Sequence, residues 1–385
     1  MNVRDMLIAL VRGVLRGEAV DACALNESLS SEKMATLFKV AKKHDVAHLV
    51  CLGLESCGIA LSGEVGQLFL KEKEQAHLRY EMMQADIQGI CACFEEEGID
   101  HVMLKGAVVR QYYPEAWMRT SCDVDILVKE EALEAAVDAL VNQCGYKVDG
   151  KKAYHDISLY SPFGMHLELH HNIKENEPKF DELLTQVWAF CQKEQGYEHR
   201  FSQSLEFLLF HLTAHAAYHF VGGGCGLRSV LDIWLLSGCL HYDGDKLHAL
   251  LTQAGLSTFY SVLLSLGEYW FGSAKEADKI VKDTELYILL GGVYGTAKQG
   301  AVAKQVKKGG KARYFLSRIF LPYESLAVLY PVIKKHKILT PFCQVARWFG
   351  ALFKGKRIKK EIKNVTSASR EQTSQIRELM SALGL

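Results

Sequence analysis

The chain reads LKGAVVRQYYPEAWMRTSCDVDILV from Leu104 to Val128, a Lys-Gly turn followed later by a short apolar strand that contains two aspartates. Aspartate is a poor strand former, and residues i and i+2 of a strand point to the same face. We therefore expect Asp123 and Asp125 to project together. Val124 and Ile126 would then point the other way, into a core.

Two neighbouring carboxylates repel each other, and without compensation at least one of them would have a raised pKa. The usual compensation is a hard divalent cation. Mg²⁺ prefers oxygen ligands and is commonly held by one or two carboxylates together with substrate phosphates. The alternative is a strand that leaves the core, with Asp123 and Asp125 solvated at its edge. The preceding turn and the apolar residues on both sides favour the metal site.

A third carboxylate lies in the segment HLELHH, where Glu168 shares a strand face with His166 and His170. If this strand lies beside the first, Glu168 completes a set of three acids with Asp123 and Asp125. Such a set can hold two metal ions for an in-line displacement at phosphorus. The sequence thus predicts a site for Mg²⁺, with two ions as one arrangement.

The rest of the chain divides by its periodicity. Residues 98–200 contain short apolar or alternating segments between turns, as a small mixed β-sheet core does. Residues 1–97 form an N-terminal helical region and residues 201–300 a helical domain. Residues 301–385 form a basic, partly helical C-terminal region interrupted by prolines. We predict an α+β fold, a small mixed sheet flanked by helical regions.

Several local features follow from the same patterns. A long helix is expected over 72–98, and Ser31 is a plausible N-cap of an earlier helix. Residues 162–164, Pro-Phe-Gly, predict a hairpin turn. The glycines at 222–224 lack the spacing of a phosphate loop and predict a mobile connection.

The composition bounds the class of protein. The chain has 385 residues, 49% hydrophobic and 23% charged, with a formal net charge of zero. This length corresponds to two or three domains of roughly 100–200 residues each. The eleven cysteines have no CxxC or zinc-ligand spacing. No apolar run is long enough for a transmembrane segment. We expect a reducing, cytoplasmic environment.

The charge is unevenly distributed. From residue 304 to 363 there are sixteen Lys or Arg residues and two acids. Near the end of this segment Trp348, Phe349, Leu352 and Phe353 alternate with basic residues. That pattern suits a polyanion, a membrane surface or an acidic protein partner. The alternative is a helix that packs its apolar face on the acidic body of the protein.

His211, His215 and His219 recur every four residues and therefore share one helix face. They could bind zinc, line the active site, or make ordinary hydrogen bonds between helices. The sequence has no HExxH or other ligand pattern to support zinc. On the helical segment that follows the glycines at 222–224, Arg228 and Asp232 are four residues apart and could pair with each other.

The motifs LKG, YP, R, DVDILV and LELHH resemble the uncharacterised nucleotidyltransferase family of the DNA polymerase beta-like superfamily. The segments LLFHLTAHAAYHF and LRSVLDIWLL resemble the helical part of that family, and the likeness extends weakly to both ends of the chain. The resemblance implies a small mixed sheet with flanking helices. It also implies transfer of a nucleoside monophosphate from an NTP such as ATP.

By this resemblance, Asp123, Asp125 and Glu168 match the metal-binding and catalytic acids, and Gly106 matches the glycine of the turn. The superfamily's usual Gly-Ser or Gly-Gly is replaced here by Lys105-Gly106-Ala107, so no serine hydroxyl can bind phosphate. Backbone N–H groups after Gly106 and the Lys105 ammonium are the expected replacements.

Arg119, four residues before Asp123, is the candidate for a two-pronged phosphate clamp. The alternative is an ordinary surface arginine in a loop. His170 and His215 are the candidates for contact with the nucleotide or the acceptor.

Two functions remain open. The first is an Mg²⁺-dependent nucleotidyltransferase that transfers a nucleotide to an unknown acceptor hydroxyl. The second is a non-catalytic nucleotide-binding protein, regulatory or antitoxin-like, that keeps the fold. A nucleic-acid-binding module would rest only on the basic C-terminal region. The three acids favour the enzyme, and the altered turn favours the second function.

Overall fold

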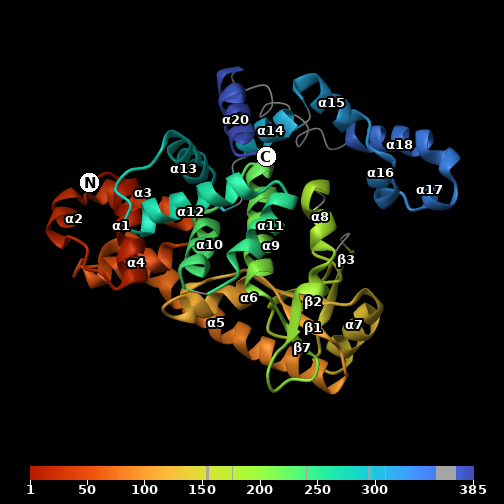
Figure 1. Cartoon of the computed structure of the whole chain (residues 1–385), viewed down its shortest axis with the longest axis horizontal. Helices are drawn as coiled ribbons and strands as arrows, with labels where there is room; N and C mark the ends of the chain where they lie inside the picture. Colours follow the sequence, from red (N-terminus) through yellow and green to blue (C-terminus); the bar gives the residue numbers. More distant parts are fainter. Residues whose placement is uncertain are drawn as a thin grey trace.

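A computed structural model describes the whole chain except residues 153–155, 176, 240, 294, 296, 308 and 353–369. Its centre is a seven-stranded mixed sheet in the order β3-β4-β5-β2-β1-β7-β6. Helices pack on both faces of the sheet (Figure 1), which confirms the predicted α+β class. The strands are β1 (His101–Met103), β2 (Asp123–Val128), β3 (Lys147–Lys152), β4 (Asp156–Tyr160), β5 (His166–His170), β6 (Cys191–Lys193) and β7 (Arg200–Gln203).

Strand β2 lies at the centre of the sheet, antiparallel to β1 and parallel to β5. In the β2–β5 register Asp125 stands opposite Glu168, so the predicted adjacency of these two strands is confirmed. β4 and β5 form the predicted antiparallel hairpin. Gly164 in its turn has φ +83°, a conformation that glycine adopts without steric cost.

Two strands were not predicted. β7 pairs in parallel with β1, and β6 pairs antiparallel with β7, so the sheet extends beyond β1. Their sequences, CQK and RFSQ, are short and lack an alternating apolar pattern. Pairing with β1, about a hundred residues earlier in the chain, defines β7 as a strand.

One face of the sheet packs on α5 (Gly63–Glu96) and α7 (Leu133–Asn142). The apolar side chains of β2 and β5 on this face, Val124, Ile126, Leu167 and Leu169, are buried against those helices. The long helix predicted over 72–98 therefore exists but begins earlier, at Gly63. It ends as expected near Gly98, which has φ +68°.

The opposite face of the sheet belongs to a second and larger core. Val102, Leu104 and Leu127 of the sheet region join side chains from the N-terminal helices and from helices of residues 205–291 in this core. The N-terminal helices are α1 (Val3–Arg16), α2 (Ala22–Ser28), α3 (Ser31–Lys43) and α4 (Ala47–Ser56). Ser30 rather than Ser31 caps α3, since its Oγ accepts the Lys33 N–H at 3.2 Å.

The later helices complete this core on the same side of the sheet (Figure 1). They are α6 (Gly106–Val109), α8 (Pro178–Leu184), α9 (Leu205–Gly222), α10 (Leu227–Cys239), α11 (Gly244–Gln253), α12 (Ser257–Phe271) and α13 (Lys279–Gly291). The glycines after α9 do not form a loose connection. Gly223 has φ +103° and lies so close to Gly300 that a Cβ on Gly223 would be 2.3 Å from the Gly300 Cα.

The C-terminal part contains α14 (Ala297–Lys307), α15 (Lys311–Ile319), α16 (Tyr323–Leu329), α17 (Val332–Lys335), α18 (Thr340–Leu352) and α20 (Arg370–Ala382). Helices α15 to α18, which we call the C-terminal arm, extend away from the body (Figure 1). The arm has a small core of its own around Leu326, Ala327 and Ile333. Helix α20 contacts α13 and α14. Among the described residues, no helix is long and apolar enough to cross a membrane.

Candidate active site

Three carboxylates meet on the sheet face opposite α5. Asp123 and Asp125 leave β2 on this face because alternate residues of a strand point the same way. Ligand atoms of Asp123, Glu168 and His166 all lie within 4.8 Å of one another. The same holds for Asp125, Glu168 and His170. Glu168 therefore joins both aspartates into one cluster of acids with an imidazole at each end.

Asp125 is the most enclosed of these acids, with 7% of its surface exposed. Lys105 Nζ lies 3.2 Å from Asp125 Oδ1, and His170 Nε2 lies 2.9 Å from the same oxygen. Burial alone would raise the pKa of Asp125. The positive charge of Lys105 and the hydrogen bond from His170 outweigh burial and hold that pKa well below its usual range.

The other two acids have pKa values that move in opposite directions. Burial raises the pKa of Asp123, and the charges of Asp125 and Glu168 raise it further. A hydrogen bond from His170 lowers the pKa of Glu168. Burial would lower the pKa of His170, but its hydrogen bonds to Asp125 and Glu168 raise it to about 9. Asp123 is therefore the acid of the three whose pKa is raised, because the charges of Lys105 and His166 do not offset burial and the two neighbouring acids.

The donor atoms in this cluster fit a divalent metal ion. Its carboxylate oxygens are the ligands that Mg²⁺ and Mn²⁺ prefer, while the imidazoles of His166 and His170 also suit softer metals. A cation beside Asp123 would relieve the repulsion that raises its pKa. The cluster of Asp125, Glu168 and His170 could thus hold a metal ion, and Asp123 is positioned to join it.

The Lys-Gly turn is held against β2. The Leu104 N–H donates to the Asp125 carbonyl at 3.0 Å. Lys105 has φ +42°, which is uncommon for a residue with a side chain and marks local backbone strain. In this backbone conformation the Lys105 ammonium contacts the Asp125 carboxylate. The helix that follows, α6, has four residues before it tightens into a 3₁₀ turn, so the expected helix after Gly106 is very short.

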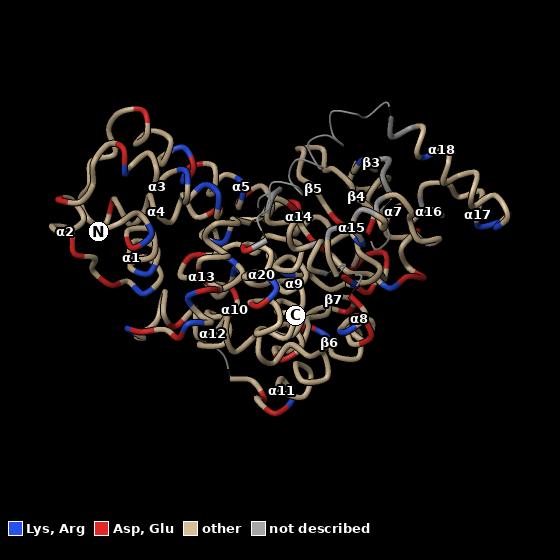
Figure 2. The backbone as a smooth tube through the Cα atoms, turned by 90° about the horizontal axis from the view of Figure 1, so that it is seen from above, with Lys and Arg blue, Asp and Glu red and all other residues tan. Residues whose placement is uncertain are grey.

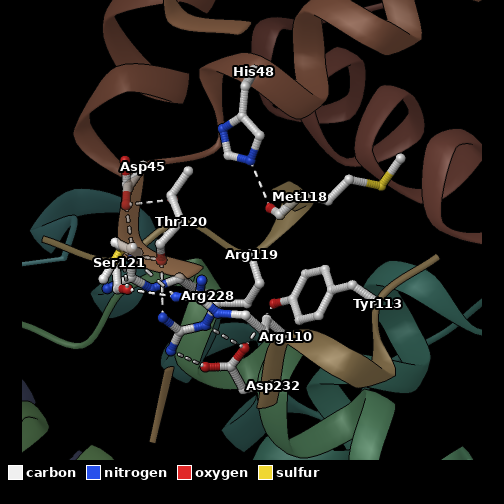
Figure 3. Close-up of polar contacts among 11 residues, drawn as sticks. Asp45, His48, Arg110, Tyr113, Met118, Arg119, Thr120, Ser121, Arg228 and Asp232 are labelled. Atoms are coloured by element: carbon white, nitrogen blue, oxygen red, sulfur yellow. Dashed lines mark hydrogen bonds and ion pairs between the residues drawn. The ribbon is translucent and has the colours of Figure 1, made fainter. Parts of the chain in front are cut away.

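Arg119 has a partner that was not predicted. Its Nε donates to Asp232 Oδ1 at 3.2 Å and its Nη2 to Asp232 Oδ2 at 2.7 Å (Figure 3). Tyr113 donates its hydroxyl to the same carboxylate at 2.7 Å. Burial would lower the pKa of Arg119, but the Asp232 carboxylate raises it above its ordinary value. The fork expected to clamp phosphate is occupied by α10, and Arg119 is buried rather than a surface loop residue.

The Arg119–Asp232 ion pair also explains why residue 106 in the turn is a glycine. A Cβ placed on Gly106 would lie 2.7 Å from Arg119 Nη1 and 3.2 Å from Ser121 Cβ. Arg119 Nη1 is held there by a 2.9 Å hydrogen bond to the Thr120 carbonyl. Glycine is therefore required for the close approach of the turn to the segment that precedes β2.

Arg228 and Asp232, which the i,i+4 spacing allowed to pair, have other partners in the structure. Arg228 Nη1 instead contacts Asp45 Oδ2 at 2.5 Å, and Thr120 Oγ1 donates to the same oxygen at 2.8 Å (Figure 3). Asp45 follows α3, so this contact joins the N-terminal helices to α10. The i,i+4 spacing allowed a local pair, but Arg228 pairs with Asp45 after α3 and Asp232 pairs with Arg119 before β2.

A cavity of about 190 Å³ opens beside the acids. His215 on α9 lines it, and its Nδ1 lies 2.6 Å from Glu175 Oε1. Burial would raise the pKa of Glu175, but the hydrogen bond from His215 lowers it to about 2. The cavity is lined by Lys105, Glu168, Ile173, Lys174, Glu175, His211, His215, Tyr218 and His219. The α9 histidine face therefore lies next to the acid cluster.

These histidines do not form a zinc site within the described part of the chain, where only the two clusters around Glu168 bring three ligands together. His211 is fully buried, and burial lowers its pKa to about 3. Burial also lowers the pKa of His219 to about 4. Glu175, Lys174 and Tyr218 were missed as site residues, because their position in the cavity has no signal in the local sequence.

Comparison with known proteins identifies the family of the chain. Residues 30–272 match the family described as uncharacterised nucleotidyltransferase. The chain belongs to this family, which confirms the resemblance in its sequence motifs. No curated protein matches the chain. A solved structure with detectable likeness is the solution structure of the antibiotic-resistance factor ANT(2'')-Ia, at 15% identity and a TM-score of 0.33, covering 50% of this chain and 95% of that chain.

Proposed function

We propose that this protein is an Mg²⁺-dependent nucleotidyltransferase that transfers a nucleoside monophosphate from an NTP, with ATP as the first candidate, to the hydroxyl of an acceptor. Membership of the nucleotidyltransferase family supports the reaction class. The observation that carries the proposal is the register of β2 and β5, which sets Asp125 opposite Glu168 with Asp123 on the same face.

Asp123, Asp125 and Glu168 would hold Mg²⁺ in this reaction. When bound, Mg²⁺ would supply positive charge that stabilises the negative charge developing on the triphosphate. The acceptor oxygen would attack the α-phosphorus, the bond to the β-phosphate would break, and pyrophosphate would leave. Glu168 also lines the cavity, and as the alternative to holding metal it would receive the proton of the acceptor hydroxyl.

Lys105 would contact the triphosphate. Its ammonium already lies 3.2 Å from Asp125 and also lines the cavity, so it can reach a phosphate bound between the acids and the turn. Gly106 lets the turn lie close to the acids by making room for Arg119. Phosphate contact by Arg119 stays a prediction, and it would require the arginine to leave Asp232.

The cavity beside Glu168 would receive the acceptor or the nucleoside. The Nδ1 atom of His215 lies 2.6 Å from Glu175 Oε1, which orients the ring, and His215 forms part of the cavity wall. His170 is enclosed and bonds to two acids, so it would orient Asp125 and Glu168 rather than contact a substrate. We expect His215→Gln to weaken acceptor use more than NTP binding, with the exposed His248→Gln as control.

A second candidate function is a nucleotide-binding regulatory or antitoxin-like protein without catalysis. One observation favours it. Lys105 and His170 already supply positive charge to Asp125, the place where an enzyme of this class needs metal. In that case nucleotide binding would not depend on Mg²⁺ and no pyrophosphate would form.

A thermal-shift titration of the four NTPs with and without Mg²⁺ separates the two functions. A ligand at a hundred times its dissociation constant stabilises by about 2.7 kcal/mol, which the method detects readily. The enzyme predicts a shift that requires Mg²⁺ and disappears in the Asp123→Asn/Asp125→Asn variant. Asp138→Asn on the exposed face of α7 is the matched control.

Pyrophosphate release in the presence of candidate acceptors then tests catalysis itself. An NTP shift that is unchanged by removing Mg²⁺, and unchanged in the double variant, would place the nucleotide away from the acids and support the regulatory function. We place the protein in the cytoplasm, in keeping with its many cysteines, none of which forms a disulfide among the described residues.

A further inference from the structure

The C-terminal arm carries a row of large apolar side chains on one side of α18. Ile338, in the turn before the helix, is followed by Phe342, Val345 and Phe349 at spacings of four, three and four residues. This spacing places them on one helix face. Their exposed fractions are 82, 70, 41 and 62%. A contiguous row of exposed apolar residues on a water-soluble surface marks an interaction site.

The orientation of this row is set by the opposite side of α18. Gln344 is buried and donates to the Leu321 carbonyl at 3.2 Å. Trp348 donates its indole N–H to the Ile319 carbonyl at 2.7 Å, and its ring meets that of Phe320 edge to face at 5.5 Å. The helix is therefore anchored on α15 and α16 through its polar and tryptophan side. The apolar row faces outward as a consequence.

Basic residues flank the apolar row. Lys334, Lys335 and Lys337 are exposed immediately before Ile338, at the end of the arm where α17 is coloured blue in Figure 2. In the sequence, residues 304–363 contain sixteen Lys or Arg residues against two acids. Phe353 and the basic residues after it lie outside the described residues. An exposed apolar helix face beside clustered lysines is the composition of a helix that lies in a membrane interface.

We infer that the C-terminal arm binds the surface of an anionic lipid membrane. Ile338, Phe342, Val345 and Phe349 would enter the boundary between headgroups and acyl chains, and the lysines would contact anionic headgroups. Charge decides between this partner and a second arm of the same protein, because two strongly basic surfaces repel each other. An anionic bilayer satisfies the apolar row and the positive charge together. The alternative, an apolar face packed on the acidic body, does not hold for α18, where Phe342, Val345 and Phe349 are exposed.

The test is co-flotation of the full chain with vesicles of phosphatidylcholine alone and of phosphatidylcholine mixed with phosphatidylserine. We expect binding to the mixed vesicles that weakens as salt is added. Phe342→Ser/Phe349→Ser should lower the partition coefficient by about tenfold or more per ring, since burying an aromatic side chain is worth that much. Lys334→Gln/Lys335→Gln/Lys337→Gln should lower it on the order of a hundredfold.

Phe163→Ser is the matched control, because Phe163 is 78% exposed but lies in the β4–β5 turn. It should bind mixed vesicles like wild type. Circular dichroism and thermal unfolding should be the same for all variants. Equal partition of wild type into neutral and mixed vesicles, absence of binding to both, or unchanged binding by the Phe342→Ser/Phe349→Ser variant would overturn the proposal.

Light scattering without vesicles tests whether a second copy of the chain covers the apolar row. If wild type is a dimer that Phe342→Ser/Phe349→Ser converts to a monomer, the row is an interface between copies and the membrane proposal fails. The wild type and the variant should instead have the same mass. These measurements do not involve NTP binding. Their result is therefore independent of the function proposed for the acid cluster.

Discussion

Arg119 and Asp232 form a buried ion pair across 113 residues of sequence, with only 7% and 5% of their side chains exposed. The guanidinium meets the carboxylate with two nitrogens, and Tyr113 adds a third donor to the same carboxylate. The pair joins the segment before β2 to α10. It thereby fixes the position of the acid strand relative to the helical part of the cavity wall.

We expect Asp232→Asn to lower the free energy of unfolding by about 3–5 kcal/mol, because it leaves the buried Arg119 without a charged partner. Urea denaturation measures this loss. The matched control is Asp45→Asn, whose partner Arg228 and own carboxylate are more exposed, at 20% and 32%. That change should cost about 1 kcal/mol or less. An Arg119→Lys variant that keeps wild-type stability but binds NTP weakly would instead identify Arg119 as a phosphate ligand.

Gly106→Ala should lower the free energy of unfolding by about 1–3 kcal/mol, the usual cost of overpacking, because the new Cβ meets Arg119 and Ser121. Gly89→Ala should have the opposite sign. Gly89 lies on the exposed side of α5 with no atom near its Cβ position, so alanine should stabilise by about 0.5–1 kcal/mol. Thermal or urea unfolding of the two variants compares them directly. Equal effects would show that Gly106 is not a packing glycine.

Lys105→Met should change two affinities in opposite directions. Loss of the ammonium frees Asp125, so Mg²⁺ alone should bind more tightly. NTP with Mg²⁺ should bind about 1.5–3 kcal/mol more weakly, because a charge-assisted phosphate contact is lost. Calorimetric titration with each ligand measures both, and the exposed Lys71→Met serves as control. A parallel loss of both affinities would mean that Lys105 supports the fold of the acid site.

Stability should depend on pH through His44. It is fully buried, its Nδ1 accepts the Leu227 N–H at 3.2 Å and its Nε2 meets the Leu289 carbonyl at 3.2 Å. Burial lowers its pKa from 6.5 to about 4. The folded protein therefore resists the proton that the unfolded chain accepts below pH 6.5, and stability falls as the pH drops from 6.5 to 4. The contribution amounts to roughly 3 kcal/mol.

His44→Asn keeps an acceptor for Leu227 and removes the titration. Urea denaturation between pH 4 and 7 should show a shallower pH dependence for this variant than for wild type, whatever its stability at pH 7. His248→Asn, on the exposed side of α11, should leave the pH dependence unchanged. Parallel curves for wild type and His44→Asn would contradict the assignment.

Much of the fold could be predicted from local patterns. The alternation in DVDILV and HLELHH gave the two central strands and the face that each side chain occupies, because a strand has a period of two residues. Helical periodicity and Gly98 located the end of α5, although the helix begins nine residues before the expected start at 72. The short strands β6 and β7 were missed, since β7 is defined by pairing with β1, which is distant in the sequence, and β6 pairs only with β7.

The sequence by itself determined which residues alternate between the two faces of β2 and of β5, and thus that Asp123 and Asp125 share a face. That Glu168 joins them depends on β5 pairing beside β2, which the tertiary structure decided. Only the tertiary structure decided which cation each acid meets. Arg119 was expected to bind phosphate but pairs with Asp232. Glu175, which the sequence did not single out, orients His215. The physical reason is that strand parity is a property of a few consecutive residues, whereas the partner of a long charged side chain depends on how separate elements pack. A buried guanidinium takes the carboxylate that shares its low-dielectric environment, and no local spacing encodes that choice.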